Sequence, residues 1–170
     1  MIYIQKSPSA DSRTAKGEVT KEELYRSSVM HIHDVQKGLQ FFADLLVKAG
    51  QKHDHTKLEY IDEFYHDFSQ KLKGKEFKDA HWYKDLHLQE RHHLPDRCPD
   101  DVTLIDVLER IADICMAGMA RSGEVYDDEL DPEILTKAFH NTIKLLISNI
   151  QVVDDEDTTD RVQNFTSQLK

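Results

Sequence analysis

The stretch 52–57 places a histidine and an aspartate side by side, just after a long segment of regularly spaced apolar residues has ended. A neutral imidazole nitrogen and a carboxylate oxygen are two donor types that hold a divalent metal ion while leaving positions open for water. His53 and Asp54 are therefore candidate metal ligands. Two ligands do not make a site, and a polar turn between helices is the alternative interpretation of the same residues.

A metal site needs further ligands from other elements, and the apolar spacing predicts where they lie. The first predicted helix begins at a capping box at Thr20 and ends at Gly50, and its apolar residues recur every three or four positions. At about 100° per residue, His31 falls within this apolar stripe. We therefore expect His31 to face inward.

Two later helices carry the remaining candidates. A third helix, predicted over 77–93, ends in the adjacent histidines His92 and His93. A fourth, predicted over 102–121, carries Asp106 and Asp113 seven residues apart and hence on one face. Small residues on that face permit a second helix to approach closely, which favours a packed face. The alternative interpretation is that this face is exposed to solvent. In chain order, the inward candidates are His31, His53–Asp54, His92–His93 and Asp113.

Composition and spacing together predict an all-α protein. The 170 residues are 32 % charged and 39 % apolar with six Gly and four Pro, which is typical of a soluble, helix-rich chain. Helices predicted over 56–72 and 132–150 complete a single compact domain of about five main helices. We expect this domain over 20–153, an N-terminal arm over 1–19 and an acidic tail over 154–170. A domain of this size buries a core without a structural metal.

Charge and cysteine usage restrict the function further. A formal net charge of -10 disfavours broad nucleic-acid binding through a basic face. Cys98 and Cys115 lack the spacing of a thiolate zinc site or a disulfide framework, which favours a reducing compartment. The sequence has no apolar run of membrane-spanning length and no signal-peptide pattern at its start. We therefore expect a cytoplasmic protein away from membranes, and a homo-oligomer is compatible with the sequence.

The ordered candidates resemble a known family. A histidine, a His-Asp pair about twenty residues later and an aspartate on a later helix are similar to the pattern of the HD-domain metal-dependent phosphohydrolases. Lys57 matches the lysine that often follows their His-Asp after two intervening residues. More narrowly, the chain resembles a small, largely uncharacterised HD-like family of bacteriophages and gut bacteria over roughly residues 20–150. The stretches that carry this likeness are 31–34, 53–58, 90–93, 104–113 and 116–123.

The resemblance implies an all-helical domain with one or two divalent ions between its helices. The ligands that it implies are His31, His53, Asp54 and Asp113, with His92–His93 similar to the additional histidines of two-metal members and His92 as a further ligand. Asp106 would be a supporting or catalytic carboxylate. Mn, Fe, Ni, Co, Zn and Mg are not distinguishable from such a ligand set. The chain lacks the Glu after the histidine pair and the Gly-Tyr-Pro signature of the cyclic-dinucleotide phosphodiesterases, which disfavours that substrate.

We therefore expect a metal-dependent phosphohydrolase that attacks a small phosphate ester, a nucleotide or nucleotide-like molecule, with a metal-activated water. Lys57, Arg91 and Arg121 are candidate phosphate clamps, and His92 or His93 is a candidate acid for the leaving oxygen. The alternative for each is an ordinary surface or helix-end role. The other histidines, His87 among them, are mostly expected to have no part in the site.

A competing hypothesis is a non-catalytic helical module that binds a nucleotide or a partner protein. In that case the metal site would be degenerate or merely structural. A third is an interaction protein whose histidines are incidental, in which His31, His53 and Asp113 do not converge.

Overall fold

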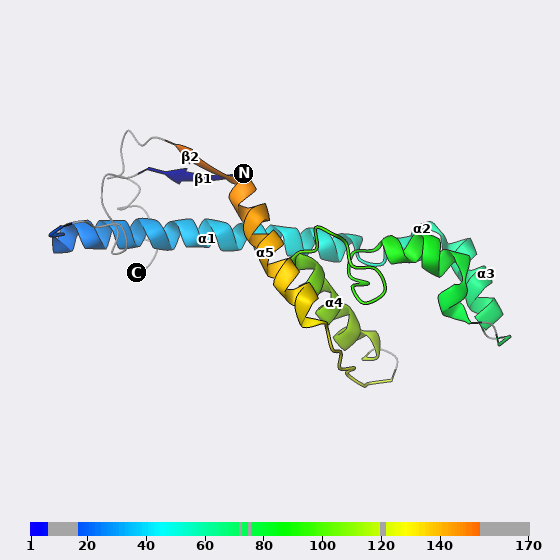
Figure 1. Ribbon diagram of the computed structural model, residues 1–170. Coiled ribbons are helices and arrows are strands. Elements are labelled where there is room, and N and C mark those ends of the chain that lie inside the picture. Colours follow the sequence, from blue (N-terminus) through cyan, green and yellow to red (C-terminus); the bar gives the residue numbers. More distant parts are fainter. Residues whose placement is uncertain (7–16, 72, 75, 120–121, 154–170) are drawn as a thin grey trace. The chain divides into compact units, whose positions relative to one another are not determined.

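The computed structural model describes residues 1–6, 17–71, 73–74, 76–119 and 122–153. Within these ranges the chain is mostly helical, with five α-helices and one two-stranded sheet, so the predicted helical class is confirmed (Figure 1). The chain divides into two units. One comprises Met1–Ala43 with Leu145–Lys170, and the other comprises Asp44–Lys144. The predicted tail over 154–170 lies outside the described residues.

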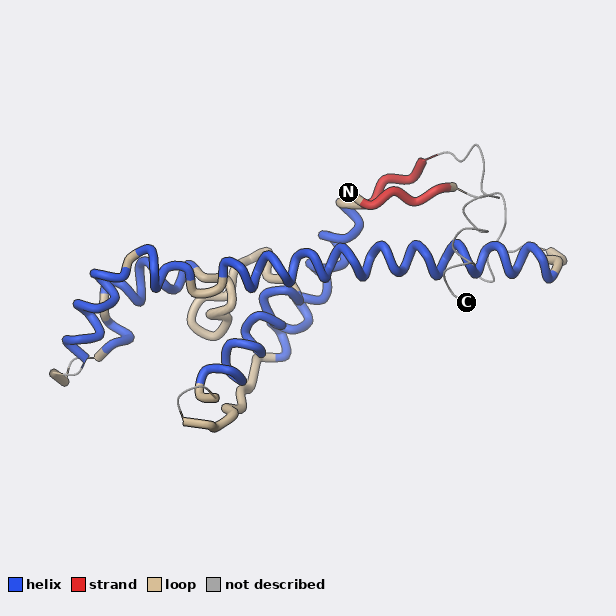
Figure 2. The backbone as a smooth tube through the Cα atoms, turned by 180° about the vertical axis from the view of Figure 1, so that it is seen from behind, coloured by secondary structure: helices blue, strands red, loops and turns tan. Residues whose placement is uncertain are grey.

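The first unit contains a small parallel sheet that the sequence did not indicate. Strand β1 (Ile2–Gln5) pairs with β2 (Ile150–Val153), with Ile2 opposite Ile150, and Figure 2 shows the two strands side by side. Both strands are rich in β-branched residues, which favour extended backbone. Lys37 Nζ, on helix α1 (Lys21–Lys52), donates a hydrogen bond of 2.8 Å to the carbonyl oxygen of Tyr3. This bond ties the sheet to the helix of the same unit.

Helix α1 begins at the predicted capping box. The backbone N–H of Thr20 donates to Glu23 Oε2 at 2.9 Å, and the N–H of Glu23 donates to Thr20 Oγ1 at 3.2 Å. The predicted stop at Gly50 is wrong, because the helix continues to Lys52.

The apolar stripe of α1 is exposed in the first unit. Ile32, Val35 and Leu39 are 44 %, 46 % and 62 % exposed, so the prediction that this part of the stripe is buried is wrong. Apolar spacing shows which side chains share a face, but the neighbours of that face decide whether it is buried.

The second unit contains the last turns of α1, three whole helices and most of a fourth. The whole helices are α2 (His55–Glu59), α3 (Ile61–Lys71) and α4 (Leu104–Ala117), and the fourth is α5 (Pro132–Ser148), which belongs to this unit up to Lys144. The helix predicted over 56–72 is broken at Tyr60, whose backbone is non-helical. Pro132 opens α5 as predicted, and Asp131 Oδ1 accepts a bond of 2.8 Å from the N–H of Glu133. A buried cluster forms the core of this unit: Leu94, Val102, Val107 and Ala138.

The helix predicted over 77–93 is wrong. The chain there forms three short segments, η1 (Phe77–Asp79), η2 (Trp82–Leu86) and η3 (His87–Gln89), of which η2 is a π-type turn. Trp82 is 1 % exposed, and its ring stacks between Phe64 at 4.2 Å and His87 at 4.4 Å between centroids. Because aromatic packing of this kind contributes more than helix propensity, it determines the local backbone.

Glycine is required where α4 ends. A Cβ at Gly118 would lie 2.6 Å from the carbonyl oxygen of Glu124 and 2.8 Å from a ring carbon of Tyr126. We expect Gly118→Ala to lower the free energy of unfolding by about 1–3 kcal/mol, because the loop must move to accommodate the methyl group. Urea denaturation measures this change.

Gly38→Ala is the matched control, since Gly38 lies in α1 and a Cβ there meets no heavy atom within 4 Å. It should raise stability by up to about 1 kcal/mol, because Ala favours a helix more than Gly. Equal destabilisation by both substitutions would contradict the close approach at Gly118.

Candidate metal site

The site begins at the turn between α1 and α2. Asp54 has a left-handed backbone with φ 55° and ψ 22°, and it is the one non-glycine residue with positive φ in the described part of the chain. This conformation costs about 1 kcal/mol for a residue with a Cβ, although Asp tolerates it better than most. The turn brings His53 Nε2 within 3.5 Å of Asp54 Oδ2. A strained residue of this kind is common at functional sites.

The first group of ligand atoms comes from His53, His92 and Asp113, whose donor atoms all lie within 4.8 Å of one another. His53 Nε2 is 3.4 Å from Asp113 Oδ1, and His92 Nε2 is 3.9 Å from Asp113 Oδ2. Ligands at about 2.1 Å from a tetrahedral ion are about 3.4 Å apart. These side chains therefore have the spacing and chemistry of a metal-binding group.

A second group shares His92 with the first and adds Asp54 and His93. His92 Nε2 lies 3.7 Å from Asp54 Oδ1, and His87 Nε2 lies at the same distance from that oxygen. His87 Nε2 is also 2.9 Å from His93 Nε2. Two overlapping groups thus surround the Asp54 carboxylate.

Glu109 contacts His53 and His92 at their Nδ1 atoms, leaving the Nε2 atoms for the site. Its Oε1 atom is 3.0 Å from His53 Nδ1, with which it is hydrogen-bonded, and 3.1 Å from His92 Nδ1, which is ion-pair distance without hydrogen-bond geometry. A carboxylate at Nδ1 favours the tautomer whose Nε2 carries the free lone pair. The hydrogen bond to Glu109 therefore directs Nε2 of His53 toward Asp54 and Asp113, and the charge of Glu109 beside His92 Nδ1 favours the same tautomer in His92.

Two of the converging atoms are buried without a hydrogen-bond partner in the described part of the chain: Asp54 Oδ1 and His92 Nε2. The His92 side chain is 1 % exposed. A buried polar atom without a partner costs about 1–3 kcal/mol. A bound cation would satisfy both atoms at once.

His87 and His93 are in the neutral form that binds a metal ion. Burial and the neighbouring His93 lower the pKa of His87 to about 3, and burial and the neighbouring His92 lower the pKa of His93 to about 4. Both imidazoles are therefore neutral at physiological pH and keep a lone pair.

The groups around Glu109 are shifted toward their charged forms. Burial acts to lower the pKa of His53, but the hydrogen bond to Glu109 and the charges of Asp54 and Asp113 outweigh it and raise the pKa. Burial acts to raise the pKa of Glu109, yet its contacts with His92 and His53 hold that pKa below its ordinary value. Burial also acts to raise the pKa of Asp54, but the hydrogen bond and charge of Lys57 outweigh it and lower the pKa.

The rest of the stretch 52–57 supports the site. The backbone N–H of Thr56 donates to Glu90 Oε1 at 3.0 Å, and Thr56 Oγ1 is 2.9 Å from His87 Nδ1. His55 Nδ1 lies 2.8 Å from the same Glu90 oxygen. Lys57 Nζ donates to Asp54 Oδ2. Every residue from His53 to Lys57 therefore contacts the site or its supports.

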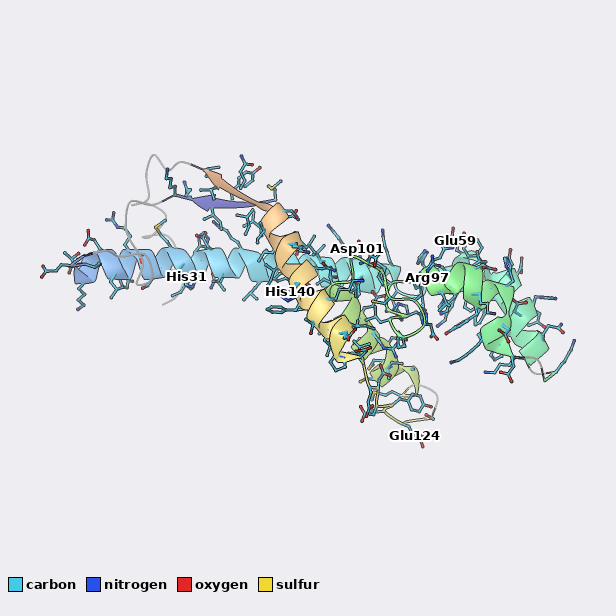
Figure 3. The ribbon with its side chains drawn as sticks, viewed as in Figure 1. His31, Glu59, Arg97, Asp101, Glu124 and His140 are labelled. Carbon is cyan, nitrogen blue, oxygen red and sulfur yellow. The ribbon has the colours of Figure 1, made fainter. Side chains whose placement is uncertain are left out.

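Several predicted site residues do not join these groups. The prediction that His31 faces inward is wrong, because its side chain is exposed on α1 in the first unit (Figure 3). It belongs to neither group, and its assignment as a ligand stays a prediction. Asp106 is buried, but it bonds Arg91 at 2.7 and 2.9 Å and the N–H of Thr103 at 2.7 Å. Its oxygens are thus occupied in capping α4 and pairing Arg91. Arg121 lies outside the described residues.

Two contributors to the site were missed in the sequence. Glu109 lies four residues before Asp113, so helical spacing places it on the same face, but it is not among the candidates that the sequence pattern gave. His87 is brought in by the irregular segment around Trp82. Helical spacing over 77–93 gives no signal for it, because that segment is not an α-helix.

No protein-family model, curated protein or solved structure matches this chain in the comparisons. Among the described helices, none combines the length and apolar character needed to cross a bilayer.

Metal binding should release a proton and strengthen as pH rises. The pKa of His53 is raised above 6.5, so the metal-free site holds a proton near neutral pH, whereas a bound metal requires the neutral imidazole. The affinity for the metal ion should increase from about pH 6 until the pH exceeds the raised pKa of His53, and it should be constant above that pH. The stability contributed by protonated His53 follows the opposite course: it is present below 6.5 and is lost as pH rises through the raised pKa.

Calorimetry with Mn²⁺ in two buffers of different ionisation enthalpy measures the released protons. His53→Gln should remove the proton release that depends on this group. Equal affinity at about pH 6 and pH 8 would contradict the role of His53.

Proposed function

We propose that this protein is a metal-dependent phosphohydrolase of the HD type that acts on a small phosphate ester. One observation carries the proposal: Asp54 Oδ1 and His92 Nε2 are buried without partners among the described residues and lie at ligand spacing from one another, and His92 Nε2 is also 3.9 Å from Asp113 Oδ2. Burying unpaired polar atoms is costly unless a ligand satisfies them. A His and carboxylate set of this composition suits a divalent ion.

The residues that would hold the ion are His53, His92 and Asp113, with Asp54, His93 and His87 around a second position. When bound, a divalent ion there supplies hydroxide near neutral pH and withdraws electron density from a phosphoryl oxygen. The His and carboxylate composition and the position of Lys57 after His-Asp agree with the resemblance to the HD-domain enzymes.

Other side chains have roles of their own in this proposal. Lys57 lines the same cavity as His53 and Asp113, and its side chain is 39 % exposed, so its ammonium group can leave Asp54 and bind a phosphate. His93, with a pKa of about 4, is neutral and serves as a ligand. An acid for the leaving oxygen needs a pKa nearer the working pH, which makes His93 a poor candidate for that role.

The metal content of purified variants tests the site. His92→Gln should lose most of the bound metal, because Gln supplies neither imidazole nitrogen. Asp54→Gly should lose metal as well, while the metal-free fold keeps or gains stability, because Gly adopts the left-handed turn without strain. Elemental analysis of protein purified without chelator, with thermal denaturation of the chelated protein, measures both properties.

His140→Gln is the control for these variants, since His140 is an exposed histidine on α5 (Figure 3). Equal metal content in His92→Gln, Asp54→Gly and His140→Gln would refute the metal site. His31→Gln, in the same experiment, tests the remaining prediction for His31.

Glu109→Gln tests how the histidines are held. We expect a loss of about 10- to 100-fold in metal affinity or in phosphate release, because the amide can donate to Nδ1 and so no longer favours one tautomer. Excess metal should recover part of the activity, whereas it should not rescue Asp113→Ala. An unchanged metal affinity in Glu109→Gln would show that Glu109 does not orient the ligands.

A further inference from the structure

The cavity beside the metal-binding groups has two kinds of wall. It encloses about 560 Å³ within the second unit, and its polar side carries His53, Asp54, Glu109, Asp113 and Lys57. The other lining side chains are apolar: Leu46, Ala49, Leu108, Ala112, Met116 and Ala117. A cavity of this volume accepts a small organic molecule.

The spacing of residues along helix α4 places side chains on both walls of the cavity. Leu108, Ala112 and Met116 follow one another at intervals of four residues, and Glu109 and Asp113 form the adjacent row. Leu108 is 46 % exposed and Met116 is 62 % exposed, so both have apolar surface that a ligand can cover. An apolar row thus runs directly beside the row that carries the candidate ligand Asp113 and the supporting carboxylate of Glu109.

The charges of the cavity favour one phosphate group over several. Among its described lining residues Lys57 is the one lysine or arginine, against the carboxylates of Asp54, Glu109 and Asp113. In the described part of the chain, Arg91 and Arg110 are the arginines next in sequence to the site residues His92 and Glu109, and both are engaged: Arg91 bonds Asp106 and Asp101, and Arg110 bonds Asp128 at 2.7 Å. A di- or triphosphate would bring negative charges for which these residues offer no further cation.

The apolar wall also disfavours a nucleobase. Its six side chains carry no hydrogen-bond donor, and only the weak thioether acceptor of Met116. A buried base edge would lose its bonds to water without replacement, which opposes binding. An alkyl or aryl group has no hydrogen bonds to water to lose there, and it covers the apolar surface of Leu108 and Met116.

We propose that the cavity takes a phosphate monoester of an apolar alcohol, with the phosphate at the metal-binding groups and Lys57 and the alkyl or aryl group on the apolar wall. As a statement about substrate, this rests on the proposed phosphohydrolase function. In that reaction the oxygen of one water bonds to phosphorus, the bond from phosphorus to the ester oxygen breaks, and a proton passes to the alcohol. The products are the alcohol and inorganic phosphate.

Two measurements on the manganese-loaded full chain test this inference. The first is the affinity for methyl-, butyl- and hexylphosphonate by calorimetry, which needs no turnover. The second is phosphate release from butyl and phenyl phosphate and from AMP and ATP. Affinity for the phosphonates should rise about two- to fourfold for each methylene that reaches the wall, and the apolar esters should have higher kcat/KM than the nucleotides.

Met116→Gln replaces the exposed apolar side chain with a polar one of similar length. It should reduce the dependence on chain length while leaving the affinity for methylphosphonate within about twofold. Met119→Gln is the matched control, because Met119 is 47 % exposed and is not among the residues that line the cavity. It should keep the chain-length dependence of the unaltered protein.

The outcomes separate the two proposals. Chain-length dependence that Met116→Gln reduces, without release of phosphate from any ester, supports the ligand class and refutes the phosphohydrolase. Hydrolysis that favours AMP or ATP, with equal affinity for all three phosphonates, refutes the ligand class and leaves the phosphohydrolase standing. Equal effects of the Met116 and Met119 substitutions would also overturn the proposed position of the apolar group.

Discussion

The carboxylate of Glu109, placed between the Nδ1 atoms of His53 and His92, is the contact on which the site depends. One oxygen within 3.1 Å of both rings sets their orientation, so that both Nε2 atoms face Asp54 and Asp113. Helix α4 carries Glu109 and Asp113 one turn apart, and therefore supplies both the support and a ligand. Without the support, either ring could rotate and the ligand spacing would be lost.

The site contains features that lower the stability of the fold, and favourable packing elsewhere in the second unit must offset them. Asp54 adopts a strained backbone, its Oδ1 atom is buried without a partner among the described residues, and the carboxylates of Asp54, Glu109 and Asp113 all lie within 3.5 Å of His53. The core around Leu94, Val102 and Val107 lies in the same unit and contributes stability through apolar burial. Unfavourable features concentrated in one place, beside an ordinary core, are typical of a functional site.

Capping and ligand binding are divided between neighbouring positions of α4. Asp106 satisfies the N–H of Thr103 and pairs with Arg91, which fixes the start of the helix. Glu109 and Asp113 then project from the following turns toward the histidines. The first carboxylate positions the helix, and the next two act at the site. Arg91 is consequently engaged in structure and does not line the cavity.

The sequence by itself determined the local features of this protein. Thr20 and Glu23 specify a helix start through bonds three positions apart, and this start was predicted correctly. The start at residue 132 was also predicted correctly, and there Asp131 Oδ1 accepts a bond from the N–H of Glu133. The histidine and carboxylate pattern gave His53, Asp54, His92 and Asp113 as candidates, and these four residues lie in the two overlapping groups of the structure. Only the tertiary structure decided the rest. The stack of Phe64, Trp82 and His87 replaces a regular helix over 77–93, and this draws His87 to Asp54. Spacing places residues on a face only where the backbone is regular, and contacts from distant elements decide what that face meets.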